Sequence, residues 1–383
     1  MNNGKWFGGT QSENLTNNKE RNALKNVFIR VMETQGFDEV NLPALDYSEK
    51  YILNNEYSEA QNHYKAIAPN GEVLALSDDL IAGLISMSTT GIEPKGRLCA
   101  FGEEKNFLAE NYAKASEYRF GGIIYGNSGI EEECDVILAG INFAKEIGIE
   151  QPKVTISNVN AFKGVLNLYA KREEKLERLK SIMSGRIEND VDYAVSQTLA
   201  PYKNVEGGAE TVKELAAKID NKQSIDGLLD IFEICNLLNA YGAEGKIVVK
   251  PGYLGAYRHD SGMVFAIEDE KHGVIAYGGR CDCKKGNEDI GCLYIVSNVD
   301  NALIAARENG VFDKRQARTI TVAVAPTGKA LEKAYKVRQD FAREQLFTRM
   351  IYGVDKKEAY ALMGKKTAGM VIYIDEDGNI LHS

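Results

Sequence analysis

Apolar residues recur along this chain with two spacings, one typical of helices and one typical of strands. Residues 17–34 carry apolar side chains every three or four positions, from Leu24 to Met32, and Gly36 follows as a stop signal. This pattern predicts an amphipathic helix. Residues 130–147 predict a second helix, because the acidic residues at its beginning suit a helix N-terminus.

A charged, helix-rich stretch runs from about residue 167 to residue 241 and contains few strand-like runs. Short apolar runs at residues 153–157 and 246–250 flank this stretch and predict strands. We therefore expect a helical insertion that interrupts one sheet.

The last part of the chain predicts a separate domain. Residues 313–318 are polar and basic, as is typical of a linker. Beyond them, apolar runs suited to strands alternate with helical patterns, which predicts a small α/β domain. We expect a core domain over residues 1–312 and a second domain over residues 318–383.

One predicted hairpin carries the most informative chemistry. Residues 263–277 form two apolar runs around a polar turn, and the second run leads into Gly278-Gly279-Arg280-x-Asp282. Two glycines let the backbone approach a bound molecule, and the Arg280 guanidinium offers a planar fork to a carboxylate or phosphate while Asp282 holds it. The pattern indicates a small-ligand pocket. The alternative is a Gly-Gly turn followed by a surface Arg-Asp pair.

Composition narrows the class of protein. A chain of 383 residues with 44% hydrophobic and 26% charged residues is ordinary for a soluble protein of two or three domains. The formal net charge of −9 argues against nucleic acid as a partner, because affinity for a polyanion comes mainly from Lys and Arg. The apolar runs are far shorter than the roughly 20 residues that span a bilayer. The polar N-terminus lacks the layout of a secretory signal, so we expect a cytoplasmic protein.

The six cysteines do not form a disulfide framework in a chain of this length. Cys99, Cys134 and Cys235 lie among apolar residues and are expected in the core. Cys281 and Cys283 form a C-x-C pair, but tetrahedral zinc sites need a second matching pair, which is missing. We expect neither a metal nor another cofactor.

A family resemblance emerges from the order of these features. The hairpin sequence Tyr-x-x-x-Ser-Gly-Met-Val-Phe-Ala from Tyr257, followed by Gly-Gly-Arg-x-Asp, resembles the histidine-binding hairpin of histidyl-tRNA synthetase. It is more similar still to the synthetase's paralogue family, the regulatory subunits of ATP phosphoribosyltransferase. Residues 16–47, 71–84 and 97–126 are similar, in the same order, to the first class II synthetase motif, the following strand and helix entry, and the second motif.

The resemblance implies an α+β fold. Its class II aminoacyl-tRNA synthetase-like core would be a mixed, mainly antiparallel sheet flanked by helices, with a helical insertion. The small α/β C-terminal domain would resemble a shortened anticodon-binding domain.

The resemblance also implies a histidine-like pocket. Asp78 occupies the place of the acidic residue that holds the amino group of histidine, Arg119 replaces a glutamine of the second motif, and Ile123 replaces a glutamate. The expected ligand-binding residues are Asp78, Arg119, Tyr257, Arg258, Gly278, Gly279, Arg280 and Asp282.

Two positions that carry phosphate-binding arginines in class II synthetases hold other residues here. The second-motif position is Gly102, and the third-motif position falls near Asn298. Adenylation gathers negative charge that guanidinium groups must stabilise. We therefore expect no catalytic residues.

The resemblance implies a non-catalytic regulatory subunit of ATP phosphoribosyltransferase. It would act with a short-form catalytic subunit at the first step of histidine biosynthesis, dimerise through the first-motif region, and respond to a small effector such as histidine. One alternative is a working aminoacyl-tRNA ligase. Another is a synthetase-like paralogue that binds a different small ligand or a protein.

Overall fold

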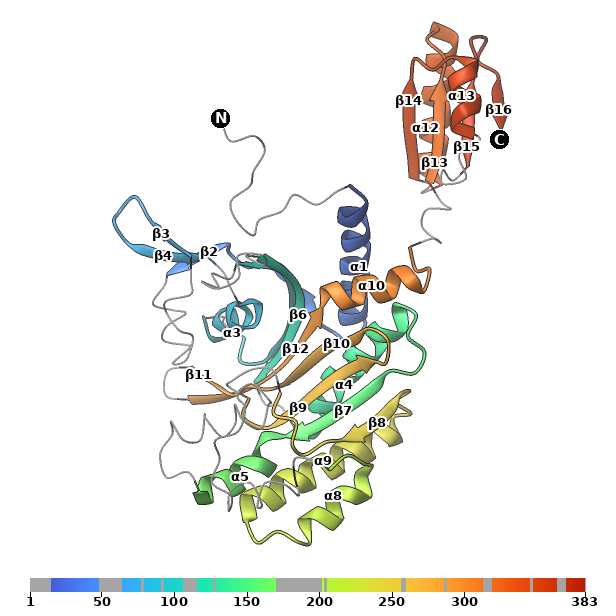
Figure 1. Ribbon diagram of the computed structural model, residues 1–383. Coiled ribbons are helices and arrows are strands. Elements are labelled where there is room, and N and C mark those ends of the chain that lie inside the picture. Colours follow the sequence, from blue (N-terminus) through green and yellow to red (C-terminus); the bar gives the residue numbers. More distant parts are fainter. Residues whose placement is uncertain are drawn as a thin grey trace, which may run out of the picture. The chain divides into compact units, whose positions relative to one another are not determined.

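The computed structural model describes most of the chain (Figure 1). The described residues are 15–47, 64–76, 79–90, 93–105, 116–126, 129–169, 202, 205–255, 260–285, 288–312, 319–344, 347–363 and 370–382. The chain divides into two compact units, Met1–Ala305 and Ala306–Ser383. The expected linker, residues 313–318, lies outside the described residues, so the predicted domain boundaries stay a prediction.

A nine-stranded sheet forms the centre of the first unit. Its strands are β1 (Asp38–Glu39), β5 (Gly96–Lys105), β6 (Ser116–Gly126), β7 (Lys153–Asn158), β8 (Lys246–Val249), β9 (Met263–Asp269), β10 (Gly273–Arg280), β11 (Cys283–Lys285) and β12 (Glu288–Asn298). They run in the order β1-β5-β6-β12-β10-β9-β7-β8, and β11 pairs with β12. Only the outer pairs β1–β5 and β7–β8 are parallel, so the sheet is mainly antiparallel, as predicted.

Helices cover both faces of this sheet. On one face lie α1 (Leu15–Glu33) and α4 (Ile130–Glu146), and on the other lies α3 (Leu80–Thr90) (Figure 1). Two adjacent glycines of β6 allow this close packing, because their missing side chains point to opposite faces. A Cβ at Gly121 would lie 2.9 Å from Leu80 of α3, and one at Gly122 would collide with Met32 of α1.

Further helices among the described residues follow β7, lie between β7 and β8, or follow β12. They are α5 (Val159–Tyr169), α8 (Ala209–Ala216), α9 (Lys222–Ala240) and α10 (Val299–Glu308). Helices α8 and α9 fall within the predicted helical insertion, and residues 170–201 of that insertion lie outside the described residues. A separate small sheet has the order β2-β4-β3, with β2 (Leu45–Tyr47), β3 (Lys65–Ile67) and β4 (Val73–Leu76).

The hairpin strands are longer than the sequence predicted. Strand β9 continues to Asp269, and β10 runs from Gly273 to Arg280. Gly278 and Gly279 therefore belong to a strand in the middle of the sheet, not to a turn.

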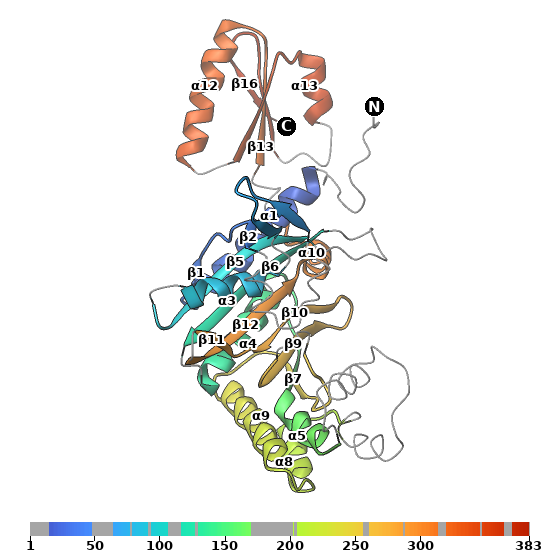
Figure 2. The same ribbon diagram turned by 90° about the vertical axis from the view of Figure 1, so that its left-hand side faces the viewer.

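The second unit is a small α/β domain, as predicted. Its strands β13 (Thr319–Val324), β14 (Phe347–Tyr352), β15 (Val371–Ile374) and β16 (Ile380–His382) have the order β14-β13-β15-β16. Helices α12 (Gly328–Arg343) and α13 (Lys356–Met363) lie on opposite sides of this sheet (Figure 2). No helix within the described residues of either unit has the length and apolar character needed to cross a membrane.

Candidate functional site

The structure describes five of the eight residues predicted to bind a ligand. Asp78, Tyr257 and Arg258 lie outside the described residues. The described ones are Arg119 on β6, Gly278, Gly279 and Arg280 on β10, and Asp282 just beyond β10.

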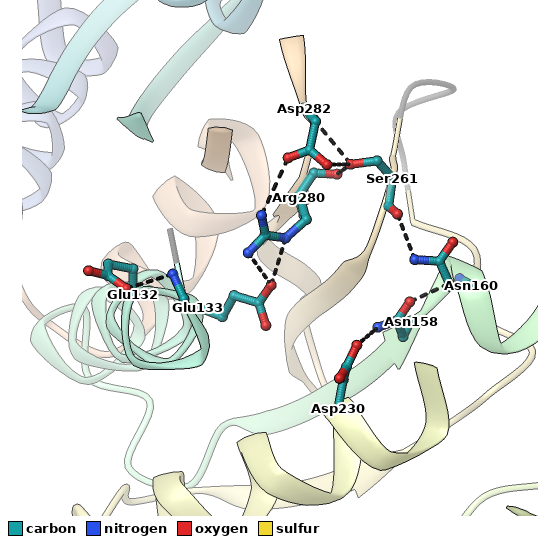
Figure 3. A network of polar contacts seen from close by, with 9 residues as sticks. Glu132, Glu133, Asn158, Asn160, Asp230, Ser261, Arg280 and Asp282 are labelled. Carbon is teal, nitrogen blue, oxygen red and sulfur yellow. Dashed lines mark hydrogen bonds and ion pairs between the residues drawn. The ribbon is translucent and has the colours of Figure 1, made fainter. Parts of the chain in front are cut away.

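Arg280 is held by a buried carboxylate from a distant part of the chain. Its Nε and Nη2 atoms both lie 2.8 Å from Oε1 of Glu133, which is near the beginning of α4 (Figure 3). Its Nη1 lies 3.4 Å from Oδ1 of Asp282, so the expected Arg-Asp contact exists beside a shorter one. Burial raises the pKa of Glu133, and the neighbouring guanidinium opposes that rise. The sequence indicated only that Glu133 lies in an acidic helix N-terminus, because nothing local marks a contact 147 positions away.

Ser261 joins the beginning of β9 to the end of β10. Its Oγ donates to Oδ2 of Asp282 over 2.9 Å, and its backbone N–H donates to the carbonyl of Arg280 over 2.8 Å. Its own carbonyl accepts a 2.8 Å hydrogen bond from Nδ2 of Asn160 (Figure 3). Arg280, Asp282 and Ser261 therefore form one connected polar group.

Packing inside the sheet accounts for the two glycines of this segment. A Cβ at Gly278 would collide with the carbonyl oxygen of Tyr294 and lie 2.6 Å from the Phe265 ring. A Cβ at Gly279 would lie 2.7 Å from the carbonyl oxygen of Met263. Both positions need glycine because neighbouring strands approach so closely.

Arg119 belongs to a second polar group. Its Nη2 lies 2.7 Å from Oε2 of Glu117, and its Nε lies 3.5 Å from Oε2 of Glu104. Glu104 also accepts a 2.9 Å hydrogen bond from the backbone N–H of Leu80, at the first residue of α3. Burial, followed by the charge of Asp79, raises the pKa of Glu104 to about 8. A ligand carboxylate would have to compete with these carboxylates for Arg119.

The two arginines lie on opposite faces of the sheet. Arg119 pairs with Asn298 of β12, and Arg280 pairs with Leu293 of the same strand. Directly opposed residues share a face, and positions an odd number apart along a strand face opposite sides. Leu293 and Asn298 are five positions apart, so the structure does not bring Arg119 and Arg280 together.

The two positions at which the resemblance implies a synthetase arginine lie on either side of Arg119. In the sheet register, Gly102 of β5 and Asn298 of β12 are the direct partners of Arg119. A Cβ at Gly102 would lie 3.2 Å from the side chain of Leu80, which would have to shift slightly to admit a side chain there. Asn298 accepts a 3.2 Å hydrogen bond from the backbone N–H of Asn301 and thereby caps α10.

Three thiols lie near the end of the hairpin. Cys281 and Cys292 are connected by a 2.7 Å backbone hydrogen bond, and Cys283 follows two residues after Cys281. Burial raises the pKa of Cys283 to about 11, which keeps this thiol protonated at neutral pH. Within the described parts of the chain, no three metal-binding side chains gather at one point.

Comparisons with known proteins match both the sequence and the fold. Residues 12–285 match the histidyl-tRNA synthetase family. The ATP phosphoribosyltransferase regulatory subunit of Clostridium acetobutylicum is 26% identical, over 84% of this chain and 82% of the relative. The subunit of the same name from Clostridium botulinum is 21% identical, over 90% and 85%.

Two solved structures share the fold. An ATP phosphoribosyltransferase regulatory subunit/histidyl-tRNA synthetase from Bacillus halodurans gives a TM-score of 0.81 at 16% identity, covering 97% of this chain and 98% of that one. Histidyl-tRNA synthetase from a Nostoc species gives 0.80 at 13% identity, covering 100% and 97%. These likenesses confirm the predicted class II synthetase-like fold. Because the family match spans most of the residues, the chain belongs to the histidyl-tRNA synthetase-like family, in which its curated relatives are ATP phosphoribosyltransferase regulatory subunits.

Proposed function

We propose that this chain is a non-catalytic regulatory subunit of ATP phosphoribosyltransferase. It acts with a short-form catalytic subunit, which joins ATP to phosphoribosyl pyrophosphate at the first step of histidine biosynthesis. The observation that carries this proposal is the likeness to curated regulatory subunits over more than four fifths of both chains.

Gly102, Arg119 and Asn298 are direct neighbours on β5, β6 and β12, and together they argue against adenylation. Gly102 and Asn298 lack positive charge, and Arg119 between them is engaged by Glu104 and Glu117. Loss of one contact to a developing negative charge typically lowers a rate by about 10²-fold to 10³-fold. Two such losses in one row disfavour the aminoacyl-tRNA ligase alternative.

The α3 face of the sheet is the proposed effector site. Glu104, Glu117 and Arg119 give this face polar and charged groups that can discriminate between small polar ligands. Histidine or a related molecule bound there would alter the partner's activity through different affinities for two conformations of the assembly. We also propose that two copies associate through the first-motif region, residues 16–47.

Reconstitution tests the proposed role directly. The purified chain, a short-form catalytic subunit, and their mixture would each be assayed for phosphoribosyl-ATP formation. We expect activity that depends on the mixture and no product from the chain alone. Product from the isolated chain, or no influence of the chain on a competent catalytic subunit, would contradict the proposal. ATP–pyrophosphate exchange with each amino acid tests the ligase alternative, and we expect none.

Calorimetry with histidine tests the effector site. Glu104→Gln replaces the buried carboxyl group of the α3 face with an amide, and Glu103→Gln is the matched control because the adjacent residue of β5 points to the other face. We expect the first variant to change histidine affinity at least about fivefold, the size of effect expected for one hydrogen bond, and the second to leave it unchanged. If the unaltered chain does not bind histidine, the effector belongs to another chemical class.

A further inference from the structure

Two strand-to-helix junctions of this chain repeat one sequence. Ser157-Asn158-Val159 joins β7 to α5, and Ser297-Asn298-Val299 joins β12 to α10. In each junction the asparagine side chain accepts a hydrogen bond from a backbone N–H of the first helical turn. The distances are 2.9 Å from Asn160 to Asn158 and 3.2 Å from Asn301 to Asn298. The two helices therefore begin in the same way.

Each junction also attaches its helix to the β9–β10 hairpin. Asn160 donates from Nδ2 to the carbonyl of Ser261 over 2.8 Å. Asn301 donates from Nδ2 to the carbonyl of Val274 over 2.9 Å. One amide from each junction thus holds one end of the hairpin, Asn160 at the end where β9 begins and Asn301 at the turn.

The first junction has additional contacts with the insertion helix α9. Nε2 of Gln223 donates to Oδ1 of Asn160 over 3.2 Å, so the Asn160 amide bridges α9 and Ser261. Nδ2 of Asn158 donates to Asp230 of α9 over 3.2 Å (Figure 3). A Cβ at Gly227 would lie 2.5 Å from the backbone nitrogen of Ala161. Helix α9 therefore rests directly on the first turn of α5, and a shift of α9 displaces Asn160.

The residues that Asn160 contacts are in turn bonded to residues on the α3 face of the sheet. Ser261 is fixed by Asp282 and the backbone of Arg280 on one side. Its neighbour Asp260 is buried and accepts a 2.7 Å hydrogen bond from the Tyr294 hydroxyl. Tyr294 packs in the apolar cluster beneath α3. The segment 260–262 therefore connects α9 with the face that carries the proposed effector site.

We propose that Asn160 couples the position of the helical insertion to the segment 260–262, so that binding at the α3 face and displacement of α9 influence each other. The identity of the effector rests on the proposed function. The coupling between α9 and the segment 260–262 is independent of it. Coupling between two sites is reciprocal, so a change at α9 must alter the segment 260–262, and a change in that segment must alter α9.

Amide hydrogen exchange without any ligand tests the coupling. Asn160→Ala removes the side-chain bridge and leaves the 2.9 Å backbone hydrogen bond from Val159 to the carbonyl of Gly262. Asn301→Ala is the control that removes the amide contact at the other end of the hairpin. We expect Asn160→Ala to accelerate exchange about fivefold in both residues 222–232 and residues 260–265, as follows from the loss of one or two hydrogen bonds. The control should accelerate exchange only around Val274.

Gln223→Ala tests the reverse direction, because this uncharged residue of α9 donates from Nε2 to the amide oxygen of Asn160. We expect faster exchange in 260–265 for this variant too. If Asn160→Ala does not fold, Asn160→Asp, which replaces the amide donor with a carboxylate oxygen, is compared with Asn301→Asp. The proposal would be wrong if Asn160→Ala accelerated amide exchange only in residues 260–265. It would also be wrong if Asn301→Ala accelerated exchange in residues 222–232 and 260–265 as much as Asn160→Ala does.

Calorimetry with histidine separates this inference from the proposed function. If histidine binds, Asn160→Ala should weaken its affinity at least about threefold while Asn301→Ala leaves it unchanged, and equal affinities would count against the coupling. If the unaltered chain does not bind histidine, the effector assignment fails, and the exchange results alone decide whether α9 and residues 260–262 are coupled.

Discussion

Arg119 and Arg280 point away from each other across one sheet, and each is neutralised by carboxylates on its own face. Glu133, the partner of Arg280, comes from α4, whereas Glu104, a partner of Arg119, is bonded to the first residue of α3. The two arginines thus fasten different helices to the same sheet. Either could be a ligand-binding residue only by giving up part of a structural contact.

Replacing Arg280 should destabilise the first unit substantially. Arg280→Ala would leave Glu133, whose side chain is only 7% exposed, without its counter-charge. Removal of one partner of a buried ion pair typically costs about 3–5 kcal/mol. Chemical denaturation followed by circular dichroism would measure the loss.

Arg97 provides the control for this measurement. It lies on the same face as Arg280 and pairs with Asp135 of α4 over 2.6 Å, but the two side chains are 28% and 33% exposed. Solvent screening limits such a pair to about 1 kcal/mol or less. If Arg97→Ala and Arg280→Ala lowered the free energy of unfolding equally, the burial of Glu133 would not determine the loss.

Local patterns in the sequence predicted the elements better than the contacts between them. Helix α4 begins at Ile130, as its acidic first turn indicated, and β7 begins at Lys153 as predicted. The extension of β10 to Arg280 was not predicted, because glycines interrupt the apolar pattern there. Those glycines are required by Tyr294 and Phe265, which come from two other strands. The residues next to these glycines in the sequence do not indicate which distant residues will contact them.

The candidate site was predictable only where its residues are close in sequence. The Arg280–Asp282 contact follows from a spacing of two residues, and the structure contains it. Glu133 and Asn160 were not predicted, because they meet the hairpin segment from helices far away along the chain, and neither was the contact of Asp230 with Asn158. The separation of Arg119 from Arg280 depends on strand register, which the apolar pattern alone did not fix.

Glu104 should make the stability of the first unit depend on pH. Its pKa is about 8 in the folded protein against 4.5 ordinarily, so between these values the folded state holds a proton that the unfolded state has released. Stability therefore falls as pH rises from about 4.5 to about 8 and then levels off, by at most about 1.4 kcal/mol per pH unit. Glu104→Gln should remove this slope and Glu103→Gln should keep it, as denaturation at several pH values would reveal.

Gly278 should not tolerate a methyl group. Gly278→Ala forces a Cβ against the Tyr294 carbonyl and the Phe265 ring, and neither can withdraw from the middle of the sheet. We expect a loss of about 3 kcal/mol or more, or failure to fold. Gly328→Ala is the control, because no atom lies within 4 Å of its added Cβ and alanine suits a helix better. Thermal unfolding that is unchanged by Gly278→Ala would refute the close approach of β9, β10 and β12.

Tyr294 should stabilise the segment 260–262 through its hydroxyl. Tyr294→Phe keeps the ring in the apolar cluster and removes the 2.7 Å hydrogen bond to Asp260, a buried carboxylate. Removing a donor from a buried acceptor costs about 1–3 kcal/mol, and the loss should appear both in chemical denaturation and as faster amide exchange at residues 260–262. Tyr335→Phe, at a tyrosine that is 64% exposed, should change stability by less than about 0.5 kcal/mol. If both variants changed stability and amide exchange equally little, Asp260 would be held in place by its other contacts. The Tyr294 hydroxyl would then not be the link between the segment 260–262 and the α3 face.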